Sequence, residues 1–135
     1  MIDRRAALLM SAGACLAAAM APAVAFAEVG PPEAFSQAAF DKALEEGRPI
    51  LVHVETSWCP ICRAQKPVLA KLRAEERFKN LLSFEIDFDA DKAGARSVGA
   101  RHQSTIIVYK DGKEVGREVG ESQPEWIEDL LERTL

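Results

Sequence analysis

Two cysteines separated by two residues carry the clearest chemical signal in this sequence. Cys59 and Cys62 follow a mostly apolar, β-branched run at residues 50–55, and they stand where a helical pattern begins. At a helix N-terminus, unpaired backbone N–H groups and the helix dipole favour a negative charge. We therefore expect Cys59 to be a thiolate nucleophile. Cys62, three residues later, is placed to attack the mixed disulfide that Cys59 forms.

Half of a zinc site is the alternative explanation of the same spacing. Structural zinc normally takes four protein ligands, and the chain has only two histidines, His53 and His102, to complete such a set. We therefore expect a redox-active cysteine pair that uses no metal ion and no other cofactor.

The first 27 residues have the pattern of a cleaved export signal. Arg4 and Arg5 precede an apolar, alanine-rich run, and Ala25-Phe26-Ala27 provides the small residues that signal peptidase requires. We expect cleavage after Ala27, a periplasmic or otherwise exported protein, and one domain over residues 28–135. The paired arginines also resemble a twin-arginine signal, so the export route stays open.

Removal of this leader would leave two cysteines, because Cys15 lies within it. A disulfide between Cys59 and Cys62 closes a loop too small to give much entropic stabilisation. In an oxidising compartment, such a pair indicates redox chemistry rather than a structural cross-link.

Length and composition fit a single globular domain. The chain has 135 residues, of which 48% are hydrophobic and 28% are charged, and its formal net charge is −4 at pH 7. This composition excludes a disordered chain and gives no basic surface for nucleic acid. We expect a monomer.

Hydrophobic periodicity predicts alternating helices and strands after the leader. We expect strands at 50–55, 82–87, 105–110 and 113–119, and helices over about 36–46, 59–76, 91–98 and 122–131. Ser36 would cap the first helix, and Pro67 should kink the second. Asp111-Gly112 is a two-residue hairpin turn, and Ser122 with Glu125 would begin the last helix as a capping box. This order predicts an α/β fold in which helices flank both faces of a central mixed β-sheet.

Several spaced motifs resemble the thioredoxin family. Ser57-Trp58-Cys59-Pro60-Ile61-Cys62-Arg63 is similar to the family's active-site signature, and Pro67 matches its helix-kinking proline. Residues 105–112 resemble the strand and hairpin after the family's active-site loop, and Val119-Gly120 matches the end of the second hairpin strand. The resemblance covers residues 35–135. It implies a thioredoxin fold with an attacking first cysteine and a resolving second cysteine.

One departure from the family pattern lies in the loop that faces the cysteines. The family usually has a cis-proline directly before the residue that matches Thr105, and here this position is Ser104. A cis bond before a residue other than proline costs about 3 kcal/mol, so we expect trans or strained backbone. The resemblance implies that Ser104 and Thr105 contact the backbone of the client protein.

Two further departures exchange a pair of polar residues. His53 replaces the family's buried acid six residues before the first cysteine, and Glu85 stands where many members have a lysine. The alternation of their strands would place both side chains beneath the cysteine pair. We expect them to relay a proton for Cys62, because a buried titratable pair is otherwise costly. A purely packing role is the alternative.

The residues around the cysteines favour a reductant. Trp58 would shield one side of the pair, and Pro60-Ile61 contains no basic group that would stabilise a thiolate as a strong oxidant requires. We expect a thiol–disulfide oxidoreductase that reduces disulfides of exported client proteins and is recharged by a membrane electron donor. Net oxidation or isomerisation is a second possibility, and a redox-silent metal- or protein-binding module is a third.

Overall fold

The computed structural model describes residues 30–135, so the predicted export signal at 1–27 lies outside the described residues. These residues form a five-stranded sheet in the order β1-β3-β2-β4-β5. The strands are β1 (Glu33–Ala34), β2 (Ile50–Glu55), β3 (Leu82–Asp87), β4 (Thr105–Lys110) and β5 (Lys113–Val119). β1, β3 and β2 are parallel to one another, whereas β4 is antiparallel to both β2 and β5.

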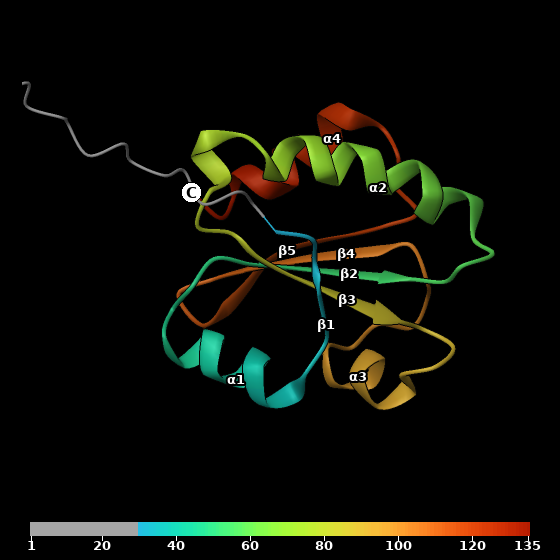
Figure 1. Cartoon of the computed structure of the whole chain (residues 1–135), viewed down its shortest axis with the longest axis horizontal. Coiled ribbons are helices and arrows are strands. Elements are labelled where there is room, and N and C mark those ends of the chain that lie inside the picture. The colour runs from blue at the N-terminus through green and yellow to red at the C-terminus, as the bar shows by residue number, and fades with distance from the viewer. Residues whose placement is uncertain (1–29) are drawn as a thin grey trace, which may run out of the picture.

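Helices cover both faces of the sheet, which confirms the predicted α/β architecture. The helices are α1 (Gln37–Glu45), α2 (Pro60–Arg73), α3 (Lys92–Ser97) and α4 (Pro124–Glu132), with a 3₁₀ turn η1 (Glu76–Phe78). Figure 1 shows α1 and α3 on one side of the sheet and α2 and α4 on the other. In the part of the chain from residue 30 onward, no helix has both the length and the apolar character needed to cross a membrane.

The alternation of strand residues divides the interior into two cores. Along β2, Val52 and Val54 belong to the core beneath α1 and α3, and Leu51 belongs to the core beneath α2 and α4. His53 is also on the α2 side, where it lines a cavity together with Leu51. Both faces of β2 are therefore buried, as its near-continuous apolar run predicts.

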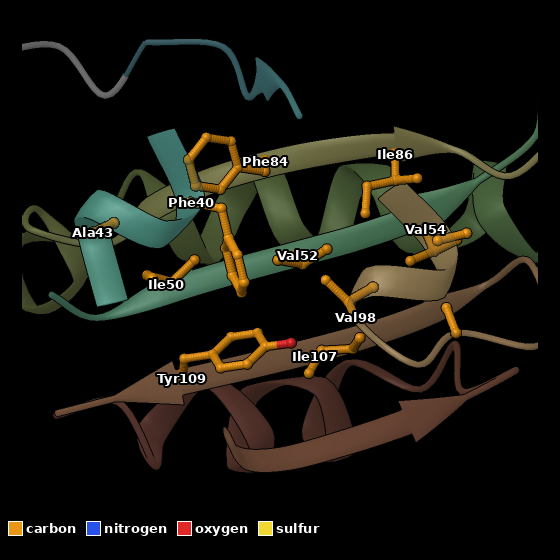
Figure 2. Packing of buried hydrophobic residues seen from close by; sticks show 12 residues of the cluster. Phe40, Ala43, Ile50, Val52, Val54, Phe84, Ile86, Val98, Ile107 and Tyr109 are labelled. Carbon is orange, nitrogen blue, oxygen red and sulfur yellow. The ribbon is translucent and has the colours of Figure 1, made fainter. Parts of the chain in front are cut away.

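An aromatic cluster fills the core beneath α1 (Figure 2). The Phe40 ring lies 5.1 Å from that of Tyr109 and 6.2 Å from that of Phe84, in edge-to-face arrangements. Aromatic pairs of this geometry add to the stability gained from their buried area. This packing fills the side of the sheet opposite α2, the helix that contains Cys62.

The structure confirms the predicted hairpin and the first helix cap. Ser36 caps α1 by accepting the N–H of Ala39. Asp111 and Gly112 have φ values of 53° and 78°, which are the left-handed conformations that a two-residue type I′ turn requires.

The structure corrects the predicted end of the second helix and adds one strand. The second helix ends at Arg73 and is followed by η1, instead of continuing to Glu76. β1 was missed because two residues are too few to show a strand period.

The predicted capping box at Ser122 is wrong. The last helix begins at Pro124, whose fixed φ suits the first helical position, and its N-cap Gln123 makes no side-chain capping bond. The Glu121 carboxylate instead accepts the backbone N–H groups of Ser122 and Gln123, at 2.9 and 2.8 Å. A carboxylate one residue before the predicted cap therefore holds the segment that leads into α4, and no side chain caps the helix itself.

Candidate active site

Cys59 lies between β2 and α2 and caps the helix. Its backbone is extended (φ −79°, ψ 114°), and its Sγ accepts the backbone N–H of Cys62 at 3.1 Å. Pro60 occupies the first helical position, where its missing N–H leaves no bond unmade. The helix therefore directs an unpaired backbone donor at the Cys59 sulfur, which is the placement predicted for a thiolate.

The two cysteines differ in their contact with solvent. Cys59 keeps 3% of its surface exposed and Cys62 keeps none. Burial, and then its hydrogen bond with Cys59, raise the pKa of the Cys62 thiol to about 11. Backbone groups of Thr56 and Ser104 oppose this rise by hydrogen bonding to the sulfur. Cys62 is therefore held as a thiol at neutral pH.

Two exposed apolar side chains flank the pair. Trp58 is 57% exposed and Ile61 is 42% exposed, although both are large hydrophobic residues. Trp58 Nε1 donates a 2.8 Å hydrogen bond to the carboxylate of Asp89, which fixes the indole beside the start of α2. The motif thus has an apolar rim around an enclosed thiol pair.

The Ser104 loop lies at the end of β2 that carries the cysteines. Thr105 pairs with Val54 in the antiparallel β2–β4 ladder, and this register brings the start of β4 to the carboxyl end of β2. All peptide bonds in residues 30–135 are trans, and Ser104 has a φ of 56°. The expected trans backbone and the expected strain are therefore both present, since a left-handed residue other than glycine costs about 1 kcal/mol.

Local hydrogen bonds hold this loop in its conformation. The Ser104 hydroxyl donates to the carbonyl of Gln103 at 2.6 Å, and the Thr105 hydroxyl donates to the carbonyl of His102 at 2.7 Å. The Ser104 carbonyl accepts the N–H of Gly120 at 2.9 Å. Of the two predicted client-contact residues, Ser104 thus lies beside Cys62 and Thr105 begins β4, and both are buried.

His53 and Glu85 are neighbours on the face of the sheet beneath α2. They are directly paired in the β2–β3 register, and both line a cavity of about 220 Å³ together with Lys66 and Arg73. Burial lowers the pKa of His53, so its imidazole is neutral at pH 7. Burial, with the nearby charge of Glu55, raises the pKa of Glu85. The predicted juxtaposition of these two residues is present in the structure.

Among the described residues, one cluster has side chains that could hold a metal ion. His53, Glu55 and Glu85 each bring one donor atom within 4.8 Å of the others. Lys66 already places its ammonium 2.7 Å from the Glu55 carboxylate, and this hydrogen bond raises the pKa of the lysine. The cluster therefore has its own positive charge, which a metal ion would have to displace.

Gln65 is the site residue that sequence analysis missed. It is fully buried on α2, and its side chain bonds to His53, Ser104 and Glu121. The available signal was its spacing, because Cys62, Gln65, Leu69 and Leu72 form the buried stripe of the helix. A glutamine at a core-facing position needs polar partners, and here two of the three, His53 and Ser104, belong to the active site.

Comparisons with known proteins agree with this geometry. The sequence profile of the thioredoxin family matches residues 32–133. The chain is 36% identical over 86 residues to the thioredoxin Asp f 29 of Aspergillus fumigatus, covering 63% of this chain and 78% of that protein. It is 39% identical over 71 residues to a thioredoxin of Chlamydia muridarum, covering 53% and 68%.

A solved structure shows the same similarity in three dimensions. The crystal structure of Trxlp from Edwardsiella tarda EIB202 superposes with a TM-score of 0.72 and 39% sequence identity. The match covers 75% of this chain and 98% of that one. The fold and the paired cysteines therefore define a thiol–disulfide oxidoreductase. The chain belongs to the thioredoxin family.

Glycine and proline substitutions of Ser104 should differ in their effect on stability. Ser104→Gly should leave the free energy of unfolding nearly unchanged, because glycine accepts a φ of 56° and offsets its own entropic cost. Ser104→Pro should lower that free energy by more than about 1 kcal/mol, because proline requires a φ near −65°. Denaturant unfolding of the two variants measures the difference. Equal stability of both variants would show that the left-handed backbone is not needed.

Proposed function

We propose that this chain is an exported reductase that acts on disulfides of other exported proteins. The difference between the two thiols is the observation that supports this proposal best. Cys59 receives the helix N–H and keeps the pair's contact with solvent, whereas Cys62 is enclosed and its pKa is raised to about 11. In such a pair the first cysteine attacks the client disulfide, and the second later resolves the mixed disulfide.

The proposed reaction is two consecutive thiol–disulfide exchanges. The Cys59 thiolate attacks one sulfur of the client disulfide, which breaks that bond and releases the other client sulfur as a thiolate. Cys62 then loses its proton and attacks the Cys59 sulfur of the mixed disulfide, which releases the second client thiol. The client gains two electrons, and the enzyme is left with a Cys59–Cys62 disulfide.

The proton of Cys62 needs an acceptor for the second exchange. We assign this role to His53 and Glu85, acting together behind the thiol. Their cluster includes Lys66, whose pKa responds to the charge of Cys62, so the cluster lies within electrostatic range of the sulfur. His53 is a neutral imidazole that can accept a proton, and burial raises the pKa of Glu85, so both depart from their ordinary protonation behaviour as groups in proton transfer often do.

The client would bind across the exposed side of the cysteine pair. Trp58 and Ile61 offer apolar surface there. Ser104 and Thr105, the client contacts that the family resemblance implies, are themselves buried, with Ser104 beside Cys62. Pro60-Ile61 adds no charge that would strongly stabilise the Cys59 thiolate, which favours reduction over oxidation of the client.

The leader sequence supports action outside the cytosol. The arginine pair, the apolar run and Ala25-Phe26-Ala27 have the order of an export signal. NADPH-driven reduction is confined to the cytosol, so an exported reductant requires a membrane dithiol donor. That donor would return two electrons to the Cys59–Cys62 disulfide through the reverse exchanges.

Removal of the second cysteine should trap clients. Cys62→Ser can form the mixed disulfide through Cys59 but cannot resolve it, so disulfide-linked adducts should accumulate on a non-reducing gel. Cys59→Ser is the matched control and should form none, because the enclosed Cys62 cannot reach a client. Adducts with Cys59→Ser and not with Cys62→Ser would reverse the assignment.

Loss of the imidazole should slow the second exchange. His53→Gln should reduce the rate of mixed-disulfide resolution by about a hundredfold, the lower range for a lost general base, and should leave its formation unchanged. Stopped-flow kinetics with a disulfide peptide separate the two steps. His102→Gln changes an exposed histidine and serves as the control. If His53→Gln lowers only stability, the pair has a packing role.

The mass of the protein recovered from its own cells should test export and direction together. After acid quenching and thiol alkylation, we expect a chain that begins at Glu28 and carries two labels, on Cys59 and Cys62. An unprocessed chain would contradict export, and an unlabelled chain would indicate a disulfide oxidant.

The reduction potential of the purified domain should lie near −270 mV, about that of thioredoxin, and not near the roughly −120 mV of a strong oxidant.

A further inference from the structure

The Gln65 carboxamide connects three separate segments of the fold. Its Oε1 lies 2.9 Å from His53 Nε2 on β2, and its Nε2 donates to the carbonyls of Ser104 at 3.0 Å and Glu121 at 2.7 Å. An amide has two N–H donors, and both are used here. A fully buried side chain with this set of bonds can adopt only one orientation.

This orientation determines the tautomer of His53. The two carbonyl partners require the NH₂ group of Gln65, so the oxygen must face the imidazole. An oxygen can only accept, and His53 Nε2 must therefore carry the hydrogen. The ring is neutral because burial lowers the pKa of His53, so Nδ1 is left without a proton.

The same carboxamide supports the strained loop. Ser104 has a left-handed φ of 56°, and such a residue persists only where surrounding bonds hold it. Its carbonyl is held from two sides, by Gln65 and by the N–H of Gly120, while its backbone also hydrogen bonds to the Cys62 sulfur. Gln65 thus lies between the histidine and the loop beside the resolving thiol.

We propose that Gln65 is a positioning residue for thiol–disulfide exchange, which holds the Ser104 loop against Cys62 and fixes His53 as an Nε2–H donor. One side chain then sets both the surface that meets the client and the form of the imidazole behind the thiol. The part that concerns the client rests on the proposed function of the Ser104 loop. The part that concerns the tautomer rests on hydrogen bonding alone.

A matched pair of methionine variants tests the loop. Gln65→Met keeps a long, buried side chain and removes all three bonds, whereas Leu72→Met changes the same stripe of α2 away from the loop. The KM of Gln65→Met for a disulfide-bonded peptide should rise about tenfold, the equivalent of one lost hydrogen bond. Its release of the first nitrothiobenzoate from the small disulfide 5,5′-dithiobis(2-nitrobenzoate) should be affected less, because that step is the attack of Cys59 alone and uses neither the Ser104 loop nor the proton transfer from Cys62.

The two substrates separate positioning from general damage. Leu72→Met should match wild type with both substrates. If Gln65→Met loses activity equally with both substrates, or loses none with either, Gln65 does not position the loop for client binding.

Nitrogen NMR of His53 tests the second part without any client. In wild type, the ring should show a neutral Nε2–H tautomer at pH 7. Gln65→Glu places a carboxylate against Nε2 and should shift the His53 titration to higher pH, in a surrounding that already contains Glu55, Glu85, Lys66 and Arg73. An Nδ1–H tautomer in the wild-type protein would overturn the assignment. The tautomer measurement on the wild-type protein needs no variant, and its outcome is independent of whether the enzyme reduces or oxidises its clients.

Discussion

The start of α2 at the carboxyl end of β2 is the constraint on which the rest of this site depends. The chain leaves a strand that is buried on both faces, turns at residues 56–58 and enters a helix whose N-cap is Cys59. Its sulfur accepts the N–H of Cys62, and the helix turn carries Cys62 into the interior. One backbone feature therefore makes the two thiols chemically unequal.

The groups behind the thiols are arranged differently from the pattern that the family resemblance implied. A neutral histidine stands at the position of the usual acid, with Glu85 beside it on the next strand. The positive charge comes from α2, where Lys66 pairs with Glu55. The polar cluster thus contains an acid, a base and a cation, but the cation belongs to α2 and not to β3.

The loop that faces the thiols has a different backbone conformation from the one that the family resemblance implied. Where many relatives fix the backbone with a cis-proline, this chain has a trans peptide and a left-handed Ser104. The carbonyl of that residue is held by Gly120 and by Gln65, which comes from the helix that contains both cysteines. Because Gln65 also bonds to His53, the loop and the polar cluster share one support.

The sequence by itself determined the elements and the reactive pair. Apolar periodicity placed β2, β3, β4 and β5, the Asp111-Gly112 turn defined the hairpin, and the spacing of Cys59 and Cys62 at a helix start identified the chemistry. These features are local, since each depends on residues that lie close together in the sequence. The two-residue strand β1 and the Glu121 bonds that lead into α4 are also local but too short or too unusual to give a pattern.

Only the tertiary structure decided how the site is supported. The bonds of Gln65 reach residues 12, 39 and 56 positions away, so no periodicity in one helix could reveal them. The left-handed Ser104 likewise depends on Gly120 and Gln65, because a strained residue is stable only where distant segments meet around it. Local spacing selects the reactive atoms, whereas long-range hydrogen bonding decides their surroundings.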